Sequence, residues 1–285
     1  MPPQRAPALI LVTGATGRVG GQVVAQLLQA KVPFRALTRN PDAAPLPREV
    51  EVVRGDLTVP AELDLRGVDS LFLVWTAPAD AAPAAIEHIA KHARRVVLLT
   101  SPHQTPHPFF QQPNPMAAMH ANIERLIDAV GLRRTFLRPG MFAANTLPWW
   151  AAKIRTGDVV RWPYAEAPTA PIDERDIAAV AVRALLDDAH DGREYVLTGP
   201  QSLTQREQVA IIGEVLGRPL RLEEISPDEA RRELGFPPPA INMLLDAWAA
   251  ALGQPAYVTN TVAEITGRPA RTFREWVVDH AAAFE

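Results

Sequence analysis

Residues 10–21, ILVTGATGRVGG, set three glycines three residues apart directly behind a short apolar run. Residues 8–12 are continuously apolar, which is typical of a strand buried on both faces of a sheet. After the glycines, Val19, Val23 and Leu27 recur at four-residue spacing, and this periodicity predicts a helix. The stretch therefore predicts a strand, a glycine turn and a helix in immediate succession.

The three glycines of this turn have distinct physical uses. Gly14 allows the tight turn after the strand, and Gly20 lets the helix pack closely against the sheet. Gly17 lets a diphosphate approach the backbone without a β-carbon in the way, so that the free N–H groups of the helix start face the anion. Glycines that serve only turns and packing are the alternative. The strand before and the helix after favour a dinucleotide site.

Strand and helix patterns alternate along the chain. Strands are indicated at residues 33–38, 50–57, 69–77, 94–101 and 134–140, with helices at residues 81–93 and 116–131. Such alternation indicates parallel βαβ units with right-handed crossovers. The predicted fold class is α/β, a doubly wound parallel sheet of the Rossmann type, with a smaller, mostly helical C-terminal substrate lobe.

The predicted domain boundary follows the last of these strands. We expect an NAD(P)-binding Rossmann domain over residues 1–145, its sheet completed by residues 171–200, and a substrate lobe over residues 146–285. In the lobe, Thr204, Ser226 and Thr272 each stand three residues before a glutamate, the capping-box spacing, and mark three helix starts. Residues 102–115, PHQTPHPFFQQPNP, are too rich in proline for a helix or a central strand and are expected over the carboxyl edge of the sheet.

Composition narrows the class of protein. Of the 285 residues, 47% are hydrophobic and the formal net charge is −3, so we expect a packed globule and no nucleic-acid partner. The absence of cysteine excludes disulfides and thiolate chemistry. No apolar stretch reaches the roughly 18 residues of a membrane helix, and the N-terminal apolar run is too short for a signal peptide. We expect a soluble, cytoplasmic protein with no membrane partner.

Two histidine pairs resemble metal-ligand spacing. His88 and His92 are four residues apart, as are His103 and His107. No matching acid or third histidine accompanies either pair in the sequence, so no metal site is predicted.

Several motifs together resemble a known family. The spacing GxxGxxG in VTGATGRVG is similar to the extended and atypical short-chain dehydrogenase/reductase superfamily. Four further segments resemble its NmrA-like group, over most of the chain: LTRNP (residues 37–41), GDL (55–57), IERLIDAVGLRRTFLRPGMFAAN (123–145) and ITGRPARTFREWVVDHAAAF (265–284). That group includes NAD(P)-binding redox sensors and NADPH-dependent quinone reductases, so the resemblance leaves both functions open.

The end of the second strand bears on the choice of dinucleotide. NAD-binding folds usually place a carboxylate there, whereas residues 37–40 read LTRN, with no acid. Arg39, and Arg18 in the glycine loop, can pair with the 2′-phosphate, so we expect NADPH to be preferred over NADH; solvated surface arginines are the alternative. The resemblance implies that Asp56 meets the adenine, although a helix cap or a turn would also account for it.

The resemblance further implies contacts around the rest of the dinucleotide. Residues at the ends of the fourth and sixth strands would flank the nicotinamide, Ser101 fits the usual serine position, and His120 would sit at the ribose. With the glycines, the expected cofactor-binding residues are therefore Thr16, Val19, Leu57, Trp75, Thr76, Ala77, Ser101, His120, Pro139, Met141 and Phe142.

The expected catalytic pair is missing from the sequence. Many relatives in the superfamily carry Tyr-x-x-x-Lys on the helix after the fifth strand, where this chain has Met116 and His120. His120 is therefore the candidate catalytic residue, able to hold the ribose or to donate a proton near neutral pH. A solvated histidine on the helix surface is the alternative.

Aromatic residues follow two neighbouring strand ends. Phe109 and Phe110 lie in the proline-rich segment, and Trp149 and Trp150 follow the sixth strand, so these four are the predicted substrate pocket. Packing at the junction of the two lobes is the alternative.

The predicted function is NADPH-dependent reduction of a quinone or a similarly activated, aromatic acceptor by direct hydride transfer. A small aromatic or quinoid molecule is the expected partner, and a homodimer is possible. A non-catalytic redox sensor of the NmrA type is the main alternative, because the tyrosine is missing. An isomerase or epimerase with a retained cofactor is a third.

Overall fold

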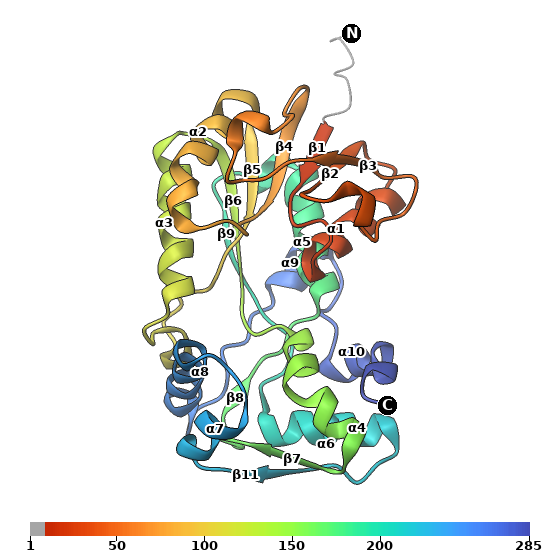
Figure 1. The fold of residues 1–285 in the computed structure, drawn as a ribbon, viewed down its shortest axis with the longest axis vertical. Coiled ribbons are helices and arrows are strands. Elements are labelled where there is room, and N and C mark those ends of the chain that lie inside the picture. The colour runs from red at the N-terminus through yellow and green to blue at the C-terminus, as the bar shows by residue number, and fades with distance from the viewer. Residues whose placement is uncertain (1–8) are drawn as a thin grey trace. The chain divides into compact units, whose positions relative to one another are not determined.

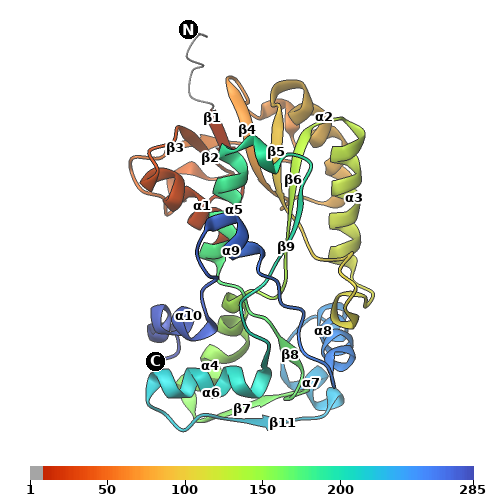
Figure 2. The same ribbon diagram turned by 180° about the vertical axis from the view of Figure 1, so that it is seen from behind.

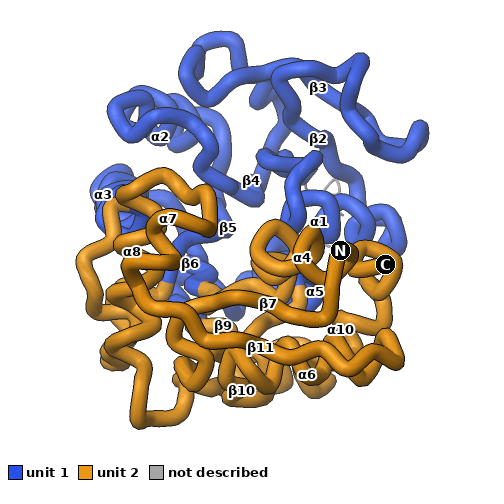
Figure 3. Tube along the Cα trace, turned by 60° about the horizontal axis from the view of Figure 1, so that its bottom comes forward, with its two compact units in different colours: residues 1–101, 116–138, 174–195 blue, residues 102–115, 139–173, 196–285 orange. Residues whose placement is uncertain are grey.

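In the computed structural model, which describes residues 9–285, the chain forms two compact units (Figure 3). Ala8, the first residue of the predicted first strand, lies outside the described residues. Unit 1 comprises the described residues up to Ser101 together with Met116–Arg138 and Glu174–Tyr195, and unit 2 comprises Pro102–Pro115, Pro139–Asp173 and Val196–Glu285.

A seven-stranded sheet is the centre of unit 1. Its order is β3-β2-β1-β4-β5-β6-β9, and its strands run parallel. The order reverses beside β1, which is the switch point where doubly wound sheets bind ligands. The predicted Rossmann fold is thus confirmed. The strands are β1 (Leu9–Val12), β2 (Phe34–Thr38), β3 (Glu51–Arg54), β4 (Val68–Val74), β5 (Arg95–Leu99), β6 (Arg133–Pro139) and β9 (Glu194–Leu197).

Helices cover both faces of this sheet. Figures 1 and 2 show α2 (Ala82–His92) and α3 (Pro115–Ala129) together on one flank, and α1 (Arg18–Gln29) and α5 (Glu174–Leu186) packed together on the other. Alternate residues of the inner strands face each core, because successive side chains of a strand point to opposite faces. The core beneath α2 and α3 contains Leu71, Leu73, Val96, Leu98, Ile86 and Ile127.

Short 3-10 turns connect several of these elements. They are η1 (Pro41–Ala43), η2 (Pro60–Glu62), η3 (Ala79–Ala81) and η7 (Asp188–His190) in unit 1, and η4 (Pro108–Phe110), η5 (Ala143–Asn145) and η8 (Ala281–Ala283) in unit 2.

Unit 2 is mostly helical and contains two small two-stranded sheets. Thr204, Ser226 and Thr272 form complete capping boxes, as predicted, and begin α6, α7 and α10. In the sheets, β10 pairs antiparallel with β8, and β11 pairs parallel with β7. The elements are η6 (Leu147–Ala151, a π-helical turn), α4 (Ala152–Thr156), β7 (Val159–Trp162), β8 (Pro168–Thr169), β10 (Leu203–Thr204), α6 (Gln205–Leu216), β11 (Arg221–Glu224), α7 (Pro227–Glu233), α8 (Pro238–Ala251), α9 (Thr261–Thr266) and α10 (Phe273–Asp279).

Tryptophans fill the core of unit 2. Trp150, Trp162 and Trp248 are fully buried, and their ring centroids lie 5.5–5.9 Å apart where they pair. Trp149 is half-buried and packs against the same cluster, 5.6 Å from the Trp162 ring. Such offset and edge-to-face aromatic pairs each stabilise a core by about 0.5–1.5 kcal/mol beyond their buried area.

Candidate functional site

The glycine turn between β1 and α1 presents an open helix start. Gly14 has φ +60°, and its carbonyl oxygen accepts the Gly17 N–H at 2.9 Å. Gly17 is the N-cap of α1, so no side chain caps the helix, and the first turn contains no acidic residue. The first helical hydrogen bond is donated by the Gly21 N–H to the Gly17 carbonyl, which leaves the N–H groups at the helix start available to an anion.

A dinucleotide diphosphate fits this turn sterically. A β-carbon at Gly17 would have one heavy atom outside its immediate chain neighbours within 4 Å, the Gly14 carbonyl oxygen in a close contact of 3.1 Å, so the other directions around Gly17 are open. A β-carbon at Gly20 would lie 2.1 Å from that same oxygen. Gly17 therefore leaves room for a ligand beside the turn, whereas Gly20 allows the helix to pack closely against the turn.

A cavity of about 280 Å³ opens beside this turn, at the carboxyl ends of four adjacent strands. We call it the glycine cavity. Its lining includes the backbone of the glycine turn, the hydroxyls of Thr13, Thr16, Thr38, Thr58 and Thr76, and the charged side chains of Arg39 and Asp56. Its lining residues are Thr13, Gly14, Thr16, Gly17, Leu37, Thr38, Arg39, Gly55, Asp56, Leu57, Thr58, Val74, Thr76, Ala77 and Pro78.

Asp56 lies in this lining with its charge held in place. Its Oδ1 accepts the Thr58 backbone N–H at 2.8 Å and the Thr58 hydroxyl at 2.9 Å. These two hydrogen bonds, and to a smaller degree the positive charge of Arg39, keep the pKa of the Asp56 carboxyl below its usual range. Asp56 is therefore ionised at neutral pH, and within residues 9–285 its carboxylate makes no hydrogen bond besides those to Thr58.

Thr13 fixes the switch point of the sheet. Its buried hydroxyl oxygen accepts the Val74 N–H at 2.7 Å and lies 3.2 Å from the Phe72 and Val74 carbonyl oxygens, so it ties the end of β1 to the end of β4. Sequence reasoning did not single out Thr13. A threonine between an apolar strand and the first glycine of the turn is the signal that could have found it.

The expected cofactor residues divide into two groups. Gly14, Thr16, Gly17, Arg39, Asp56, Leu57, Thr76 and Ala77 line the glycine cavity. The others do not line it: Arg18 is exposed at the first position of α1, Val19, Gly20 and Trp75 are buried, Ser101 follows β5, His120 lies half-buried on α3, and Pro139, Met141 and Phe142 belong to unit 2.

The helix after β5 is α3, and it contains neither residue of a Tyr-x-x-x-Lys pair. All of α3 is described, and its sequence PMAAMHANIERLIDA contains no tyrosine and no lysine. Met116 is exposed at its start, and His120 lies one turn further on.

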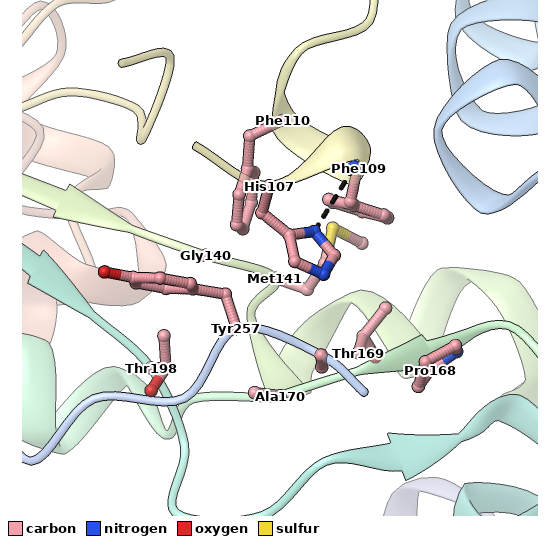
Figure 4. A pocket seen from close by; sticks show the side chains of 11 residues that line it. His107, Phe109, Phe110, Gly140, Met141, Pro168, Thr169, Ala170, Thr198 and Tyr257 are labelled. Carbon is pink, nitrogen blue, oxygen red and sulfur yellow. Dashed lines mark hydrogen bonds between the residues drawn. The ribbon is translucent and has the colours of Figure 1, made fainter. Parts of the chain in front are cut away.

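Unit 2 holds a second cavity, which we call the aromatic slot (Figure 4). It encloses about 10 Å³, room for about one water molecule, against about 280 Å³ in the glycine cavity. The slot is therefore nearly filled by its own side chains. Its lining residues are His107, Phe109, Phe110, Gly140, Met141, Pro168, Thr169, Ala170, Thr198, Ala256 and Tyr257.

His107 joins two segments that form the slot. Its Nδ1 accepts the Phe109 N–H at 3.3 Å, and its Nε2 lies 3.0 Å from the Pro255 carbonyl oxygen. Because a carbonyl oxygen can only accept, Nε2 carries the proton and the ring is the neutral tautomer. His107 is buried and both nitrogens are engaged, so it positions the walls of the slot.

The predicted substrate residues also divide. Phe109 and Phe110 line the slot, and their rings meet edge to face at a centroid distance of 5.0 Å. Trp149 and Trp150 pack in the tryptophan core and do not line it. In the sequence, His107 was noted only for its spacing from His103, and Tyr257 was not singled out; the two residues lie far apart along the chain.

The fold and the glycine cavity together define a Rossmann protein of the class that binds nicotinamide dinucleotides. The chain belongs to the NmrA-like family, whose model matches residues 7–264. No helix within residues 9–285 has the length and apolar character needed to cross a bilayer.

Relatives with similar sequences include two bacterial reductases. The chain is 41% identical to (4-alkanoyl-5-oxo-2,5-dihydrofuran-3-yl)methyl phosphate reductase of Streptomyces griseus, with 97% of this chain and 99% of the relative covered. It is 36% identical to NAD(P)H azoreductase of Xenophilus azovorans, with the same coverage of 97% and 99%.

Solved structures include Citrobacter sp. triphenylmethane reductase complexed with NADP(H). The TM-score is 0.81 at 21% identity, and the match covers 95% of this chain and 99% of the other. At this identity the likeness concerns the fold.

Proposed function

We propose that the protein is an NADPH-dependent oxidoreductase that reduces a small, electron-poor, conjugated acceptor with an aromatic or quinoid ring. The observation that carries this proposal is the glycine cavity, in which an uncapped helix start faces Arg39 and Asp56 at the switch point of the sheet. The two relatives described above, both reductases by name, support the same class of reaction.

The chain's own residues would hold the cofactor as follows. The helix start at Gly17 would take the diphosphate, Arg39 would pair with the 2′-phosphate, and Asp56 would meet the adenine. β2 ends in Leu37 and Thr38 without a carboxylate, so no acid on that strand end would repel a 2′-phosphate. A charge-assisted hydrogen bond contributes roughly 1.5–3 kcal/mol, enough to set a preference for NADPH.

The acceptor must be activated, because the chain supplies little acid catalysis on α3. A positioned general acid accelerates a reaction by about 10²–10⁴-fold, and α3 has no tyrosine to act as one. NADPH supplies the hydride when bound. Quinones, azo compounds and conjugated lactones accept hydride more readily than a simple ketone, so orientation by the protein can suffice.

The lining of the aromatic slot supports a neutral acceptor. Its lining contains aromatic rings, Met141 and small residues, with no lysine, arginine, aspartate or glutamate. A charged substituent placed in such a slot would lose its hydration without gaining a partner. We therefore propose that unit 1 binds the cofactor and that unit 2 supplies apolar surface to the acceptor.

The proposal is tested by turnover across a panel of acceptors. The purified protein is mixed with NADPH and, in turn, benzoquinone, a naphthoquinone, an azo dye and an acyl butenolide, and oxidation of NADPH is followed by its near-ultraviolet absorbance. Oxidation with at least one acceptor is expected. Tight NADPH binding without turnover of any acceptor in the panel would contradict the proposed reductase activity.

A redox sensor is the second candidate, and the composition of α3 favours it. A protein that only binds a dinucleotide needs no proton donor, and α3 has no tyrosine or lysine. The sensor requires that oxidised and reduced dinucleotide produce different states of the protein. Limited proteolysis with NADP⁺ and with NADPH measures this; identical cleavage patterns would count against the sensor.

A further inference from the structure

A third cavity lies in unit 2 and is lined by residues of α4, β7 and α7 and of the loop between α4 and β7. We call it the lysine cavity. It encloses about 340 Å³, enough for a small organic molecule. Its charged lining residues are Lys153, Asp158, Arg161 and Glu233. None of these four lines the glycine cavity, so the proposed cofactor site leaves the lysine cavity unused.

Lys153 differs from the other basic residues of the chain. Of the 29 lysines and arginines, only three are lysines, at positions 31, 91 and 153. Lys31 and Lys91 are exposed, whereas Lys153 is half-buried and lines the cavity. A guanidinium does not lose its proton in a protein, whereas an amine can, so lysine is the basic residue that can act as a nucleophile.

The Lys153 ammonium has few partners of its own. Its Nζ donates one long hydrogen bond, of 3.4 Å, to the Arg161 carbonyl oxygen, and it lies 5.0 Å from the centroid of the buried Trp162 ring. Within residues 9–285 it forms no ion pair with a carboxylate, whereas exposed Lys91 pairs with Glu87. An ammonium has three N–H donors, so two of them remain for a ligand or for water.

The carboxylates around the cavity are engaged by arginines instead. Glu233 accepts the Arg161 Nε–H at 3.2 Å, and Asp158 accepts an Arg218 N–H at 2.6 Å. Arg161 pairs with two further glutamates of β11 and α7. The charged groups here are the cations Lys153, Arg161 and Arg218 and the carboxylates Asp158, Glu223, Glu229 and Glu233. Because the carboxylates outnumber the cations, a neutral ligand with hydroxyl donors fits this cavity better than an anion.

Burial makes the Lys153 amine easier to deprotonate. It lowers the pKa of Lys153 below its ordinary value, against the opposing charge of Glu233, and the positive charge of Arg161 adds to the lowering. At neutral pH a larger fraction of Lys153 is therefore the neutral amine than of an exposed lysine. The lone pair of that neutral amine is what attacks a carbonyl carbon.

We propose that Lys153 is a nucleophilic amine that forms an imine with a small, neutral, hydroxylated aldehyde in the lysine cavity. The amine nitrogen bonds to the carbonyl carbon, and the carbonyl oxygen takes up a proton to give a carbinolamine. The carbinolamine then loses water, so both amine hydrogens leave with the carbonyl oxygen and a C=N bond remains. No electrons are gained or lost. The hydroxyl groups of the aldehyde donate to the Glu233 and Asp158 carboxylates.

The test traps the imine in the whole protein. Wild type is incubated at neutral pH with glyceraldehyde and cyanoborohydride, which reduces an imine to a stable amine. Peptide mass spectrometry follows the modification of each lysine with time, so Lys31 and Lys91 are controls in the same sample. The series is repeated over a range of glyceraldehyde concentrations and with added glycerol, which has hydroxyl groups but no carbonyl.

Lys153 is expected to be modified about threefold to tenfold faster than either exposed lysine, at a rate that saturates with glyceraldehyde concentration. Glycerol should slow the modification of Lys153 and leave Lys31 and Lys91 unchanged. Equal rates at the three lysines would overturn the proposal. A fast Lys153 whose rate rises linearly with glyceraldehyde and is unaffected by glycerol would also overturn it, because the amine would then react without a bound aldehyde.

Discussion

Gly20 lies against the carbonyl group of Gly14 so closely that a β-carbon on Gly20 would sit 2.1 Å from the Gly14 oxygen. That contact brings the first turn of α1 against the end of β1. A β-carbon on Gly17, three residues earlier, would have only one such neighbour within 4 Å, the same Gly14 oxygen at 3.1 Å. Two glycines of one motif therefore serve different ends, and substitutions can separate them.

Gly17→Ala is expected to keep the fold and to weaken NADPH binding by about 10–100-fold, because its methyl group would occupy the space of a diphosphate and remove a charge-assisted hydrogen bond. Gly17 has φ −85°, so alanine causes no backbone strain there. Calorimetric titration with NADPH and a urea denaturation curve measure the two effects. An unchanged dissociation constant for NADPH would contradict the proposed role of Gly17 in binding the diphosphate.

Gly20→Ala and Gly21→Ala are the comparisons for that experiment. Gly20→Ala should lower the free energy of unfolding by about 1–3 kcal/mol, because the methyl group meets backbone. Gly21 lies within α1 with its nearest contact at 3.6 Å, so alanine there should be neutral or stabilise by up to about 1 kcal/mol and leave NADPH affinity unchanged. Equal loss of affinity in all three variants would point to general disruption of the helix.

Arg39→Ala is expected to lower NADPH affinity by about 10–100-fold and to leave NADH affinity within about twofold, because only NADPH carries the 2′-phosphate. Arg39 lines the glycine cavity, whereas Arg18 is exposed and outside that lining. Arg18→Ala should therefore have the smaller effect. Both cofactors are titrated against each variant, and an equal loss for NADPH and NADH would remove the assignment.

The cofactor half of the molecule could be predicted because its signals are local. The apolar run of β1, the three glycines and the spacing of Val19, Val23 and Leu27 lie within twenty residues, and strand ends meet at one edge once the parallel topology is known. The missing acid after β2 is also readable in sequence. Thr13 was not predicted because its role depends on hydrogen bonds to β4, about sixty residues away.

The aromatic slot could be predicted only in part because its contacts are distant in sequence. His107 and Pro255 are 148 residues apart, and no local pattern indicates that they meet. Aromatic composition does not distinguish a pocket wall from a core: Phe109 and Phe110 line the slot, while Trp149 and Trp150 join the tryptophan cluster, to which Trp162 and Trp248 from other elements contribute. The capping boxes, by contrast, are set by three-residue spacing and were predictable.

The start of α10 gives a prediction on stability and pH. The backbone N–H and then the hydroxyl of Thr272 hydrogen-bond the Glu275 carboxylate and hold its pKa below the usual value. A carboxyl with a lowered folded-state pKa stabilises the protein above its ordinary pKa, and this contribution is lost as pH falls through the folded-state value. The stability difference between wild type and Glu275→Gln should therefore shrink on acidification.

Urea denaturation at neutral and acid pH measures this difference, with exposed Glu224→Gln as the control. Thr272→Ala removes the cap itself and should cost about 1 kcal/mol at neutral pH. A Glu275→Gln difference that stays constant from neutral to acid pH would show that the carboxylate does not contribute through its charge.

The last test concerns His107, whose ring joins two segments of unit 2. Both ring nitrogens are engaged, one with the Phe109 N–H and one with the Pro255 carbonyl, so His107 acts by holding two segments rather than by moving a proton. His107→Ala should raise amide hydrogen exchange around residues 255–259 about threefold to tenfold and leave NADPH affinity unchanged, since the glycine cavity belongs to unit 1.

His107→Asn distinguishes the two bonds of that ring. Asparagine can place an acceptor oxygen near the position of Nδ1 and so cap the Phe109 N–H, but its side chain is too short to reach Pro255. If the bond to Pro255 holds the two segments together, amide exchange around residues 255–259 should rise in the asparagine variant as much as in the alanine variant. Wild-type exchange in the asparagine variant would instead assign the effect to the cap of η4, and the proposed link between the two segments would be wrong.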